Sequence, residues 1–337
     1  MQIKENFSLL KYNTFGIDVR AGFFVEYSSA EELCAFLKDK NFIQNKKILS
    51  VGKGANLLFL SDFNGIILHS KILGKEIIRE TETEIFLRAG AGETWDDIVD
   101  FAVKNGWGGA ENLSHIPSSV GASVVQNIGA YGAEVQDLIF SVETVEIDTG
   151  NVRIFTKEEC KFAYRSSAFK TDYAGKFVIT QVTYILQKKP VFILCYGNLE
   201  NELKDKKITL QTIRETIINI RSEKLPAPET LGNAGSFFTN PVISKTQYQR
   251  LKATFPQMPC YPLSDDEVKI PAAWLIEHAG WKGFSDGKVG VHNQQALVLV
   301  NRGSASGADV AALSDKIRES VRQKFDITLV PEVIFVS

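Results

Sequence analysis

Three polar side chains occur in contexts that could support chemistry. Arg165 follows Tyr164 in the segment AYRSSAFK, Ser236 precedes two phenylalanines, and Glu332 follows a proline just before the last apolar strand. A guanidinium suits a carboxylate or a phosphate. A partly desolvated serine could act as nucleophile or proton donor, and a carboxylate in apolar surroundings needs a partner. Ser236 has neither the G-x-S-x-G elbow nor a histidine motif to serve it as a base. Taken singly, each residue is more typical of a structural role.

Two segments rich in glycine and small side chains could hold a phosphate-bearing ligand. Gly52–Gly54 follows a predicted strand, but Leu57 stands where a Rossmann fingerprint needs a third glycine, and no P-loop motif occurs. Taken alone, a structural turn is the better interpretation, although glycines let backbone amides approach a phosphate. Asn127–Gly132 lies among many small residues, which would let the backbone pack against a large flat ligand. A tight turn between strands explains this second segment equally well.

Composition excludes several classes of function. The four histidines never occur at metal-ligand spacing and the four cysteines form no C-x-x-C pair, so we expect no metal and reduced thiols. The 38 basic and 40 acidic residues nearly balance, which argues against nucleic acid and against a polybasic membrane anchor. The chain starts without an apolar leader, and no apolar stretch approaches the ~20 residues of a membrane span. We therefore predict a cytoplasmic protein.

The elements that must position these residues mix strands and helices. The patterns predict a strand at Phe23–Tyr27, a capped helix at Ser29–Lys40, and a helix at Trp95–Lys104 whose aspartates face water. Gly106–Glu134 shows no clean period but is too apolar for disorder, which is typical of a functional segment. A proline-containing linker at Lys224–Glu229 precedes a more helical part. The length of 337 residues suggests two or three domains, and we predict an α+β protein with boundaries near residues 65 and 225.

Eight segments together resemble the UDP-N-acetylenolpyruvoylglucosamine reductase family (MurB), type I branch. They occur in the order of the family and extend over nearly the whole chain. They are NTFGI (13–17), GKGANLL (52–58), PSSVGASVVQNIGAYGAE (117–134), YRSSAFK (164–170), LGNAGSFFTNP (231–241), AWLI (273–276), VHNQQALVLVN (291–301) and PEV (331–333).

The resemblance implies an α+β fold, the FAD-binding PCMH/VAO-type flavoprotein fold, with an additional C-terminal α+β substrate-binding domain. It implies FAD-binding subdomains at residues 1–65 and 66–224, with a strand at about 333–337 returning to the second, and a substrate-binding domain at 225–332. FAD would be bound noncovalently and reduced by NADPH. The enolpyruvyl group of UDP-N-acetylglucosamine enolpyruvate would then be reduced to give UDP-N-acetylmuramate for peptidoglycan synthesis. We expect a monomer.

The resemblance also implies roles for individual residues. Arg165 matches the catalytic arginine, Ser236 the proton-donating serine and Glu332 the catalytic glutamate. Tyr196, in CYGNL (195–199), matches the tyrosine that folds over the substrate. The implied FAD contacts are Val51, Gly52, Lys53, Gly54, Ala55, Asn56, Leu57, Ser118, Ser119, Val120, Gly121, Ala122, Ser123, Gln126, Asn127, Gly129, Ala130, Tyr131 and Gly132. The implied substrate contacts are Tyr164, Tyr196, Lys224, Asn240, Tyr261, Lys282 and Gln295.

The chain departs from the family pattern without losing a catalytic group. Ser118, Val124 and Ile334 stand where the family commonly has glycine, proline and arginine, and GKGAN stands where it usually has GGGSN. Two other interpretations remain. A different flavoprotein of the same fold, such as a sugar oxidase, would keep the FAD segments but need no serine–arginine–glutamate set. A catalytically silent nucleotide-sugar binder would keep Lys224 and Tyr261 but bind no flavin.

Overall fold

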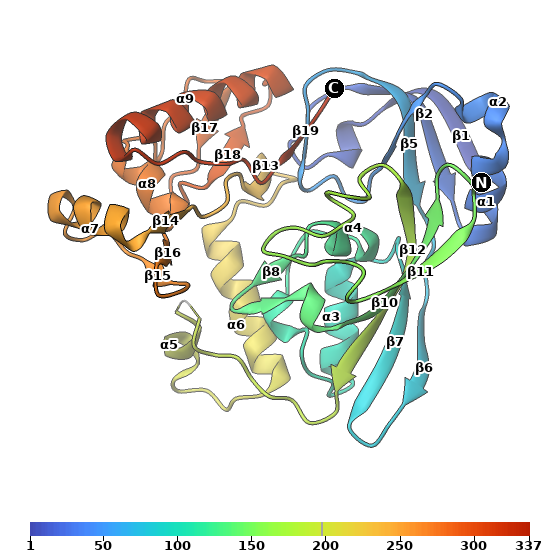
Figure 1. Ribbon diagram of the computed structural model, residues 1–337, viewed down its shortest axis with the longest axis horizontal. Helices are drawn as coiled ribbons and strands as arrows, with labels where there is room; N and C mark the ends of the chain where they lie inside the picture. The colour runs from blue at the N-terminus through green and yellow to red at the C-terminus, as the bar shows by residue number, and fades with distance from the viewer. Residues whose placement is uncertain (197) are drawn as a thin grey trace. The chain divides into compact units, whose positions relative to one another are not determined.

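The computed structural model describes residues 1–196 and 198–337 (Figure 1). The chain folds into two compact units. Unit 1 comprises residues 1–7, 21–54 and 64–222, and unit 2 comprises residues 8–20, 55–63 and 223–337. N-terminal residues thus contribute to both units, and the division into three consecutive parts stays a prediction.

The first layer of unit 1 is a four-stranded sheet in the order β1-β2-β5-β3. The predicted helix near residue 30 is confirmed, because the Ser29 side chain accepts a hydrogen bond from the Glu32 amide and caps α1. Leu33, Phe36 and Leu37 bury one face of α1. The elements are β1 (Gln2–Ser8), β2 (Arg20–Tyr27), α1 (Ala30–Lys38), α2 (Lys40–Ile43), β3 (Lys47–Ser50) and β5 (Phe63–Ser70).

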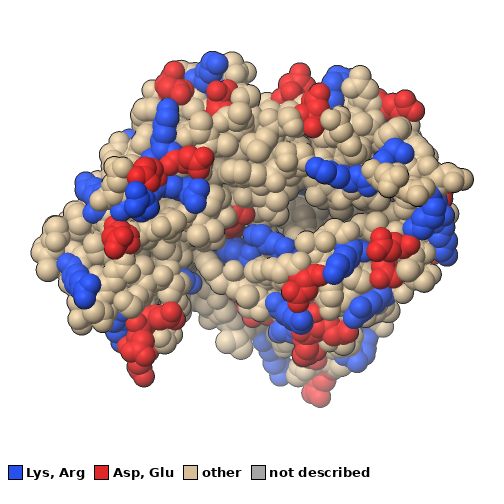
Figure 2. All heavy atoms as spheres, turned by 45° about the horizontal axis from the view of Figure 1, so that its top comes forward, with Lys and Arg blue, Asp and Glu red and all other residues tan. Residues whose placement is uncertain are grey.

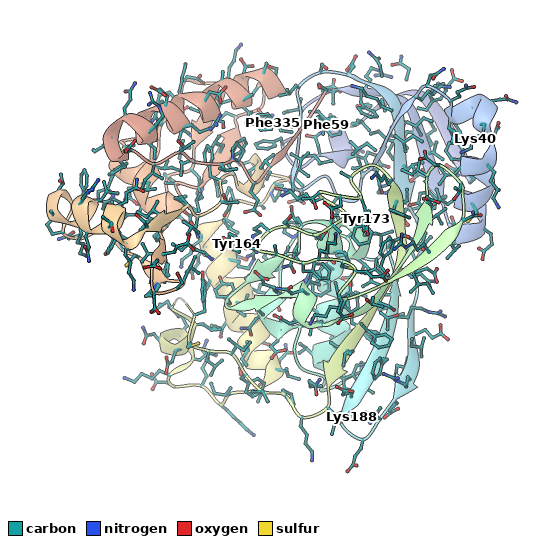
Figure 3. All side chains as sticks on the ribbon, viewed as in Figure 1. Lys40, Phe59, Tyr164, Tyr173, Lys188 and Phe335 are labelled. Atoms are coloured by element: carbon teal, nitrogen blue, oxygen red, sulfur yellow. The ribbon has the colours of Figure 1, made fainter. Side chains whose placement is uncertain are left out.

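A five-stranded antiparallel sheet in the order β11-β10-β12-β7-β6 forms the rest of the unit 1 framework. Lys40 at the start of α2 donates to the Asp148 carbonyl in the β10–β11 turn over 2.6 Å. Lys188 donates to the Glu80 carboxylate at the end of the edge strand β6. Figure 3 labels both lysines. The strands are β6 (Lys75–Glu80), β7 (Glu84–Gly90), β10 (Ile139–Glu146), β11 (Val152–Thr156) and β12 (Phe177–Gln187).

Helices α3 (Trp95–Lys104) and α4 (Val120–Val125) pack on this sheet (Figure 1). Trp95 is fully buried there and donates its indole N–H to the Leu113 carbonyl over 2.9 Å. The irregular segment around α4 is built from short pieces, which explains its lack of sequence period. These are the 3-10 turns at Glu111–Leu113 and Val135–Asp137 and the two-residue strands β8 (Gly129–Ala130) and β9 (Ala133–Glu134).

Helices α5 (Leu199–Leu203) and α6 (Leu210–Lys224) share a small core of buried leucine and isoleucine side chains. Arg214 of α6 holds Asp96 of α3 through two hydrogen bonds of 2.7 and 2.9 Å. The expectation that the α3 aspartates face water is therefore only partly right for Asp96, because a partner distant in sequence covers much of its side chain.

Unit 2 consists of small sheets with three helices. Strands β13 (Gly232–Ser236), β18 (Val298–Asn301) and β17 (Val289–Val291) form one sheet, and β14 (Val242–Ser244), β16 (Glu267–Lys269) and β15 (Tyr261–Pro262) form another. The helices are α7 (Lys245–Thr254), α8 (Ala272–His278) and α9 (Gly307–Phe325).

The C-terminal strand β19 (Ile334–Val336) runs parallel to β4 (Leu57–Phe59), and Phe59 and Phe335 lie on these neighbouring strands (Figure 3). The sequence led us to expect this strand to join residues 66–224, and the observed pairing corrects that expectation. Within the described part of the chain, no helix combines the length and hydropathy needed to cross a bilayer. Basic and acidic side chains are intermingled over the face drawn in Figure 2.

Candidate functional site

In unit 1, two of the predicted cofactor segments are in direct contact. Gly52 follows β3 at the loop, and a Cβ added there would overlap Ser119 Oγ and lie 3.2 Å from Ser119 Cβ. Gly54 completes the turn in a left-handed conformation, with φ of 65°. Ser119 is itself buried and caps α4 by accepting from the Ala122 amide. The absence of a side chain at Gly52 therefore lets the two segments meet.

Asn127 organises the end of the second segment. It is fully buried and has a left-handed φ of 47°. Its side-chain amide donates to Glu134 Oε2 over 2.8 Å and to the Ala163 carbonyl over 3.0 Å, while its Oδ1 accepts from the Gln136 amide over 3.1 Å. This one side chain thus joins the segment 118–132 to the turn that carries Tyr164 and Arg165.

Arg165 lies at the tip of that turn. Ala163 and Ser166 exchange two backbone hydrogen bonds of 3.0 Å, and Arg165 takes a left-handed φ of 55° between them. Its guanidinium donates to the Gly129 carbonyl over 2.6 Å and lies 5.1 Å from the Tyr164 ring centroid. A Cβ at Gly129 would lie 2.8 Å from Arg165 Nη1 and 3.0 Å from the Ala133 carbonyl oxygen, so a side chain there would displace the Arg165 guanidinium. The structure thus unites Arg165 with the predicted cofactor segment.

Arg221 is a neighbouring cation that the sequence did not single out. It lies on α6 and donates Nε–H to the His115 carbonyl over 3.2 Å. Burial lowers the pKa of Arg221, and burial also raises the pKa of the nearby Tyr131 phenol. Arg221 belongs to no sequence motif, so it is identified only by its position in the fold.

In unit 2, main-chain pairing brings Ser236 and Glu332 together. The Glu332 amide donates to the Phe237 carbonyl over 2.8 Å, so Ser236 and Glu332 lie on adjacent chain segments. Asn56 joins them, because its side-chain amide donates to the Glu332 carbonyl over 3.1 Å. Three residues predicted for catalysis and cofactor binding therefore lie close together in this unit.

The turn before Ser236 sets the direction of its side chain. Asn233 Oδ1 accepts from the Gly235 amide over 2.8 Å, and Gly235 has a left-handed φ of 66°. The register of β13 against β18 is interrupted between Asn233 and Ser236. As a result Phe237 is buried while Ser236 is exposed. The expected partial desolvation of the Ser236 hydroxyl is therefore not observed.

The predicted substrate residues occupy several places. Tyr164 and Tyr196 are exposed in unit 1, and residue 197 of the predicted tyrosine segment lies outside the described residues. Lys224 ends α6. In unit 2, Asn240 Oδ1 accepts from the Ala272 amide at the start of α8, and Lys282 forms a 2.9 Å ion pair with Glu277. Tyr261 is exposed on β15, and Gln295 caps the turn before β18 through its carbonyl. Their roles stay predictions.

Comparison with known proteins gives consistent results. Residues 227–336 match the model described as UDP-N-acetylenolpyruvoylglucosamine reductase, C-terminal domain, and residues 21–156 match that of the FAD binding domain. The chain is 50% identical over 335 residues to UDP-N-acetylenolpyruvoylglucosamine reductase of Bacteroides fragilis, with 99% of this chain and 100% of the relative covered. The enzymes of the same name from Porphyromonas gingivalis and Pseudomonas aeruginosa are 47% and 41% identical, with 100% and 98% of each chain covered.

The fold is similar to that of a solved reductase. The crystal structure of UDP-N-acetylenolpyruvylglucosamine reductase from Thermus caldophilus matches with a TM-score of 0.71 over 100% of both chains, at 21% identity. This match and the FAD binding domain confirm the α+β flavoprotein fold expected from the sequence.

The predicted cofactor segments of unit 1 fit a dinucleotide such as FAD. A large flat ligand with a pyrophosphate needs backbone that it can approach closely, together with small polar side chains. The contact of Gly52 with Ser119 leaves no room for a side chain at residue 52. Ser118 and Ser119 are small polar residues at the start of the second segment.

Proposed function

This chain belongs to the UDP-N-acetylenolpyruvoylglucosamine reductase family, and from that premise we propose that it reduces UDP-N-acetylglucosamine enolpyruvate to UDP-N-acetylmuramate. The reaction adds a hydride to one carbon of the enol ether and a proton to its neighbour. We further propose NADPH as the source of the hydride and peptidoglycan precursor synthesis as the setting.

Residues 21–156 form an FAD-binding domain, and we propose that Gly52–Gly54 and Ser118–Gly132 hold the cofactor there. Bound there, FAD would supply the transfer of hydride from NADPH to the substrate, which is chemistry that no side chain supplies. The close packing of Gly52 on Ser119 supports this placement.

Arg165 is proposed to bind the carboxylate of the enolpyruvyl group. Hydride addition at one carbon leaves negative charge on its neighbour and on the adjacent carboxylate, and a bidentate guanidinium stabilises that charge. The Gly129 carbonyl accepts from Arg165 at 2.6 Å. A guanidinium presents its N–H donors in a planar fork that matches the two oxygens of a carboxylate.

Ser236 is proposed to donate the proton as general acid. A serine hydroxyl is a weak acid, so it suits only a strongly basic carbanion. Glu332 is proposed to act on the same intermediate in a protonated or hydrogen-bonding form, since a bare carboxylate would repel it. The observation that carries the proposal is the 2.8 Å hydrogen bond from the Glu332 amide to the Phe237 carbonyl, which supports a shared task for Ser236 and Glu332.

Tyr164, Tyr196, Lys224, Asn240, Tyr261, Lys282 and Gln295 are proposed to contact the sugar nucleotide. Lys224 suits a diphosphate, because an ammonium acts as a point charge on a flexible stem. Tyr196 is exposed, as a residue that closes over a substrate must be before binding.

The decisive experiment mixes purified protein with NADPH and the enolpyruvyl substrate. We expect yellow protein, NADPH oxidation that depends on the sugar nucleotide, and a product heavier by two hydrogen atoms. Flavin-containing protein that turns over without this substrate would favour the sugar-oxidase alternative. Colourless protein that binds the nucleotide but takes up no added FAD would favour the silent binder.

Two further properties belong to the proposal. The cytoplasm is supported by the four free cysteines, since thiols persist in reducing compartments. A monomer is the expected state, and size-exclusion chromatography with light scattering measures it.

A further inference from the structure

The 3-10 turn Glu111–Leu113 of unit 1 holds buried polar groups that the proposed reaction does not use. The Trp95 indole N–H donates to the Leu113 carbonyl over 2.9 Å, which fixes one end of the turn. At the other end the Glu111 carboxylate accepts from the Gly109 amide over 2.6 Å. Between them lies Asn112, which is 2% exposed. The turn is therefore a rigid support for the Asn112 side chain.

Asn112 joins two segments that are distant in sequence. Its side-chain amide donates to the Tyr131 carbonyl and to the Ile193 carbonyl, each over 2.8 Å. Both acceptors are carbonyl oxygens, so only the NH₂ group can face them and the orientation of the amide is determined. Asn112 Oδ1 is buried without a hydrogen-bond partner among the described residues. An unpaired buried acceptor is unfavourable, so the use of Asn112 lies in its two donors.

The two segments that Asn112 joins also touch each other directly. Gly132 has a φ of 82°, and a Cβ there would lie 3.1 Å from Ile193 Cγ2 and 3.4 Å from Tyr196 Cβ. The Tyr131 side chain packs on the core shared by α5 and α6. The chain that carries Tyr196 is therefore seated on the backbone of the cofactor segment, with Asn112 as the polar link between them.

We propose that Asn112 is a positioning residue that fixes the segment of Tyr196 against Tyr131–Gly132. The inference rests on the proposed function, in which Tyr196 contacts the sugar nucleotide and Tyr131–Gly132 the cofactor. Asn112 acts through the carbonyls of Tyr131 and Ile193. Its loss releases the base of the Tyr196 segment, and substrate binding weakens while reduction of the cofactor continues.

A double-mutant cycle tests the route of this effect. Asn112→Ala should raise the KM for the enolpyruvyl substrate by about tenfold, as expected for lost buried hydrogen bonds, and should change the rate of flavin reduction by NADPH less than about twofold. Tyr196→Ala should raise the same KM, and adding Asn112→Ala to it should have little further effect. Independent, multiplying effects of the two substitutions, or equal damage to both half-reactions, would overturn the proposal.

Hydrogen exchange gives a readout that does not depend on activity. In Asn112→Ala, backbone amides in residues 190–196 should exchange at least about tenfold faster than in the wild type. Asn13→Ala is the matched control, because Asn13 is a buried asparagine of unit 2 whose amide donates to the Leu9 and Ile17 carbonyls over 2.8 and 3.0 Å. The control should leave residues 190–196 unchanged.

The two measurements separate failure of the function from failure of the inference. A wild-type protein inert toward the enolpyruvyl substrate would contradict the proposed function, and exchange would still decide the role of Asn112. Unchanged exchange at residues 190–196 in Asn112→Ala would refute the positioning role. Asn112→Asp should show the larger exchange effect, because it places a carboxylate oxygen against two carbonyls; should it not fold, Asn112→Ala carries the test.

Discussion

The two units hold their site residues by different means. In unit 1 the side chains of Asn127 and Arg165 themselves make the hydrogen bonds that join distant segments. In unit 2 main-chain bonds pair the segments of Ser236 and Glu332: the Glu332 amide donates to the Phe237 carbonyl, and Phe238 pairs with Pro331, while the Asn56 side chain adds one bond to the Glu332 carbonyl. Ser236 is exposed beside them.

This difference separates structural from chemical roles. A polar side chain that bridges buried segments cannot be removed without cost to the fold, because its partners lose their hydrogen bonds. A side chain positioned by its own backbone can be removed while the backbone stays in place. Substitutions in unit 1 should therefore affect stability and cofactor binding together, whereas substitutions at Ser236 should affect chemistry alone.

The largest expected effect is that of Ser236→Ala. The variant should bind FAD and be reduced by NADPH as the wild type is, because neither step uses the hydroxyl. Reoxidation by the enolpyruvyl substrate should slow by the ~10²–10⁴-fold typical of a lost general acid. Rapid-mixing measurements of the two half-reactions check this.

Two variants control that measurement. Ser236→Cys should recover part of the rate, since a thiol can also donate a proton. Ser304→Ala removes another exposed hydroxyl of unit 2 and should leave both half-reactions unchanged. Near wild-type reoxidation in Ser236→Ala would remove the catalytic role of this serine.

Asn127→Ala should show the opposite pattern. The substitution leaves the Gln136 amide of unit 1 without its partner and the Ala163 carbonyl with only its bond from the Ser166 amide, so we expect a loss of about 1–3 kcal/mol in the free energy of unfolding. FAD affinity should fall as well. Urea unfolding of the apoprotein and a flavin titration measure the two effects, and a fully stable Asn127→Ala variant would break the contrast between the units.

Gly52→Ala tests the contact between the two cofactor segments. The added Cβ overlaps Ser119 Oγ, and overpacking of this kind costs about 1–3 kcal/mol, so FAD affinity should fall roughly tenfold to a hundredfold. Adding Ser119→Ala removes the overlapping atom and should recover part of the affinity. A double variant weaker than either single one would mean that the glycine serves another purpose.

Local signals explain what the sequence predicted well. The bounds of α3 agree with the pattern. The clusters of glycine and small residues marked two segments as candidates for a phosphate-bearing ligand, and the resemblance alone assigned them to FAD. The pairing of β19 with β4 and the exposure of Ser236 could not be predicted. The first depends on contacts between residues 334–336 and 57–59, which are far apart in sequence, and the second depends on a left-handed Gly235.

Asp96 shows the same limit within one ion pair. Its pattern on α3 is that of a solvated face, yet it accepts from the Arg214 guanidinium over 2.7 and 2.9 Å and from the His115 amide over 2.5 Å. A partner 118 residues away in sequence leaves no local signal. Breaking the Asp96–Arg214 pair should give the smallest of the expected effects, and both residues belong to unit 1.

Burial disfavours the charged form of Asp96, but the Arg214 guanidinium and the His115 amide outweigh it, and the pKa of Asp96 is lowered. A carboxyl whose pKa is lower in the folded state stabilises the fold above its unfolded pKa of about 3.9. That stability is lost as the pH falls through the folded pKa, because the unfolded chain then binds the proton more readily.

Asp96→Asn should thus lower the free energy of unfolding by about 1–2 kcal/mol at neutral pH and flatten the decline of that free energy below about pH 4. Urea unfolding of the apoprotein from pH 7 to pH 3 measures both, with Asp97→Asn as the control on the same helix. An acid limb equally steep in Asp96→Asn and the wild type would show that the Asp96–Arg214 pair contributes nothing to stability.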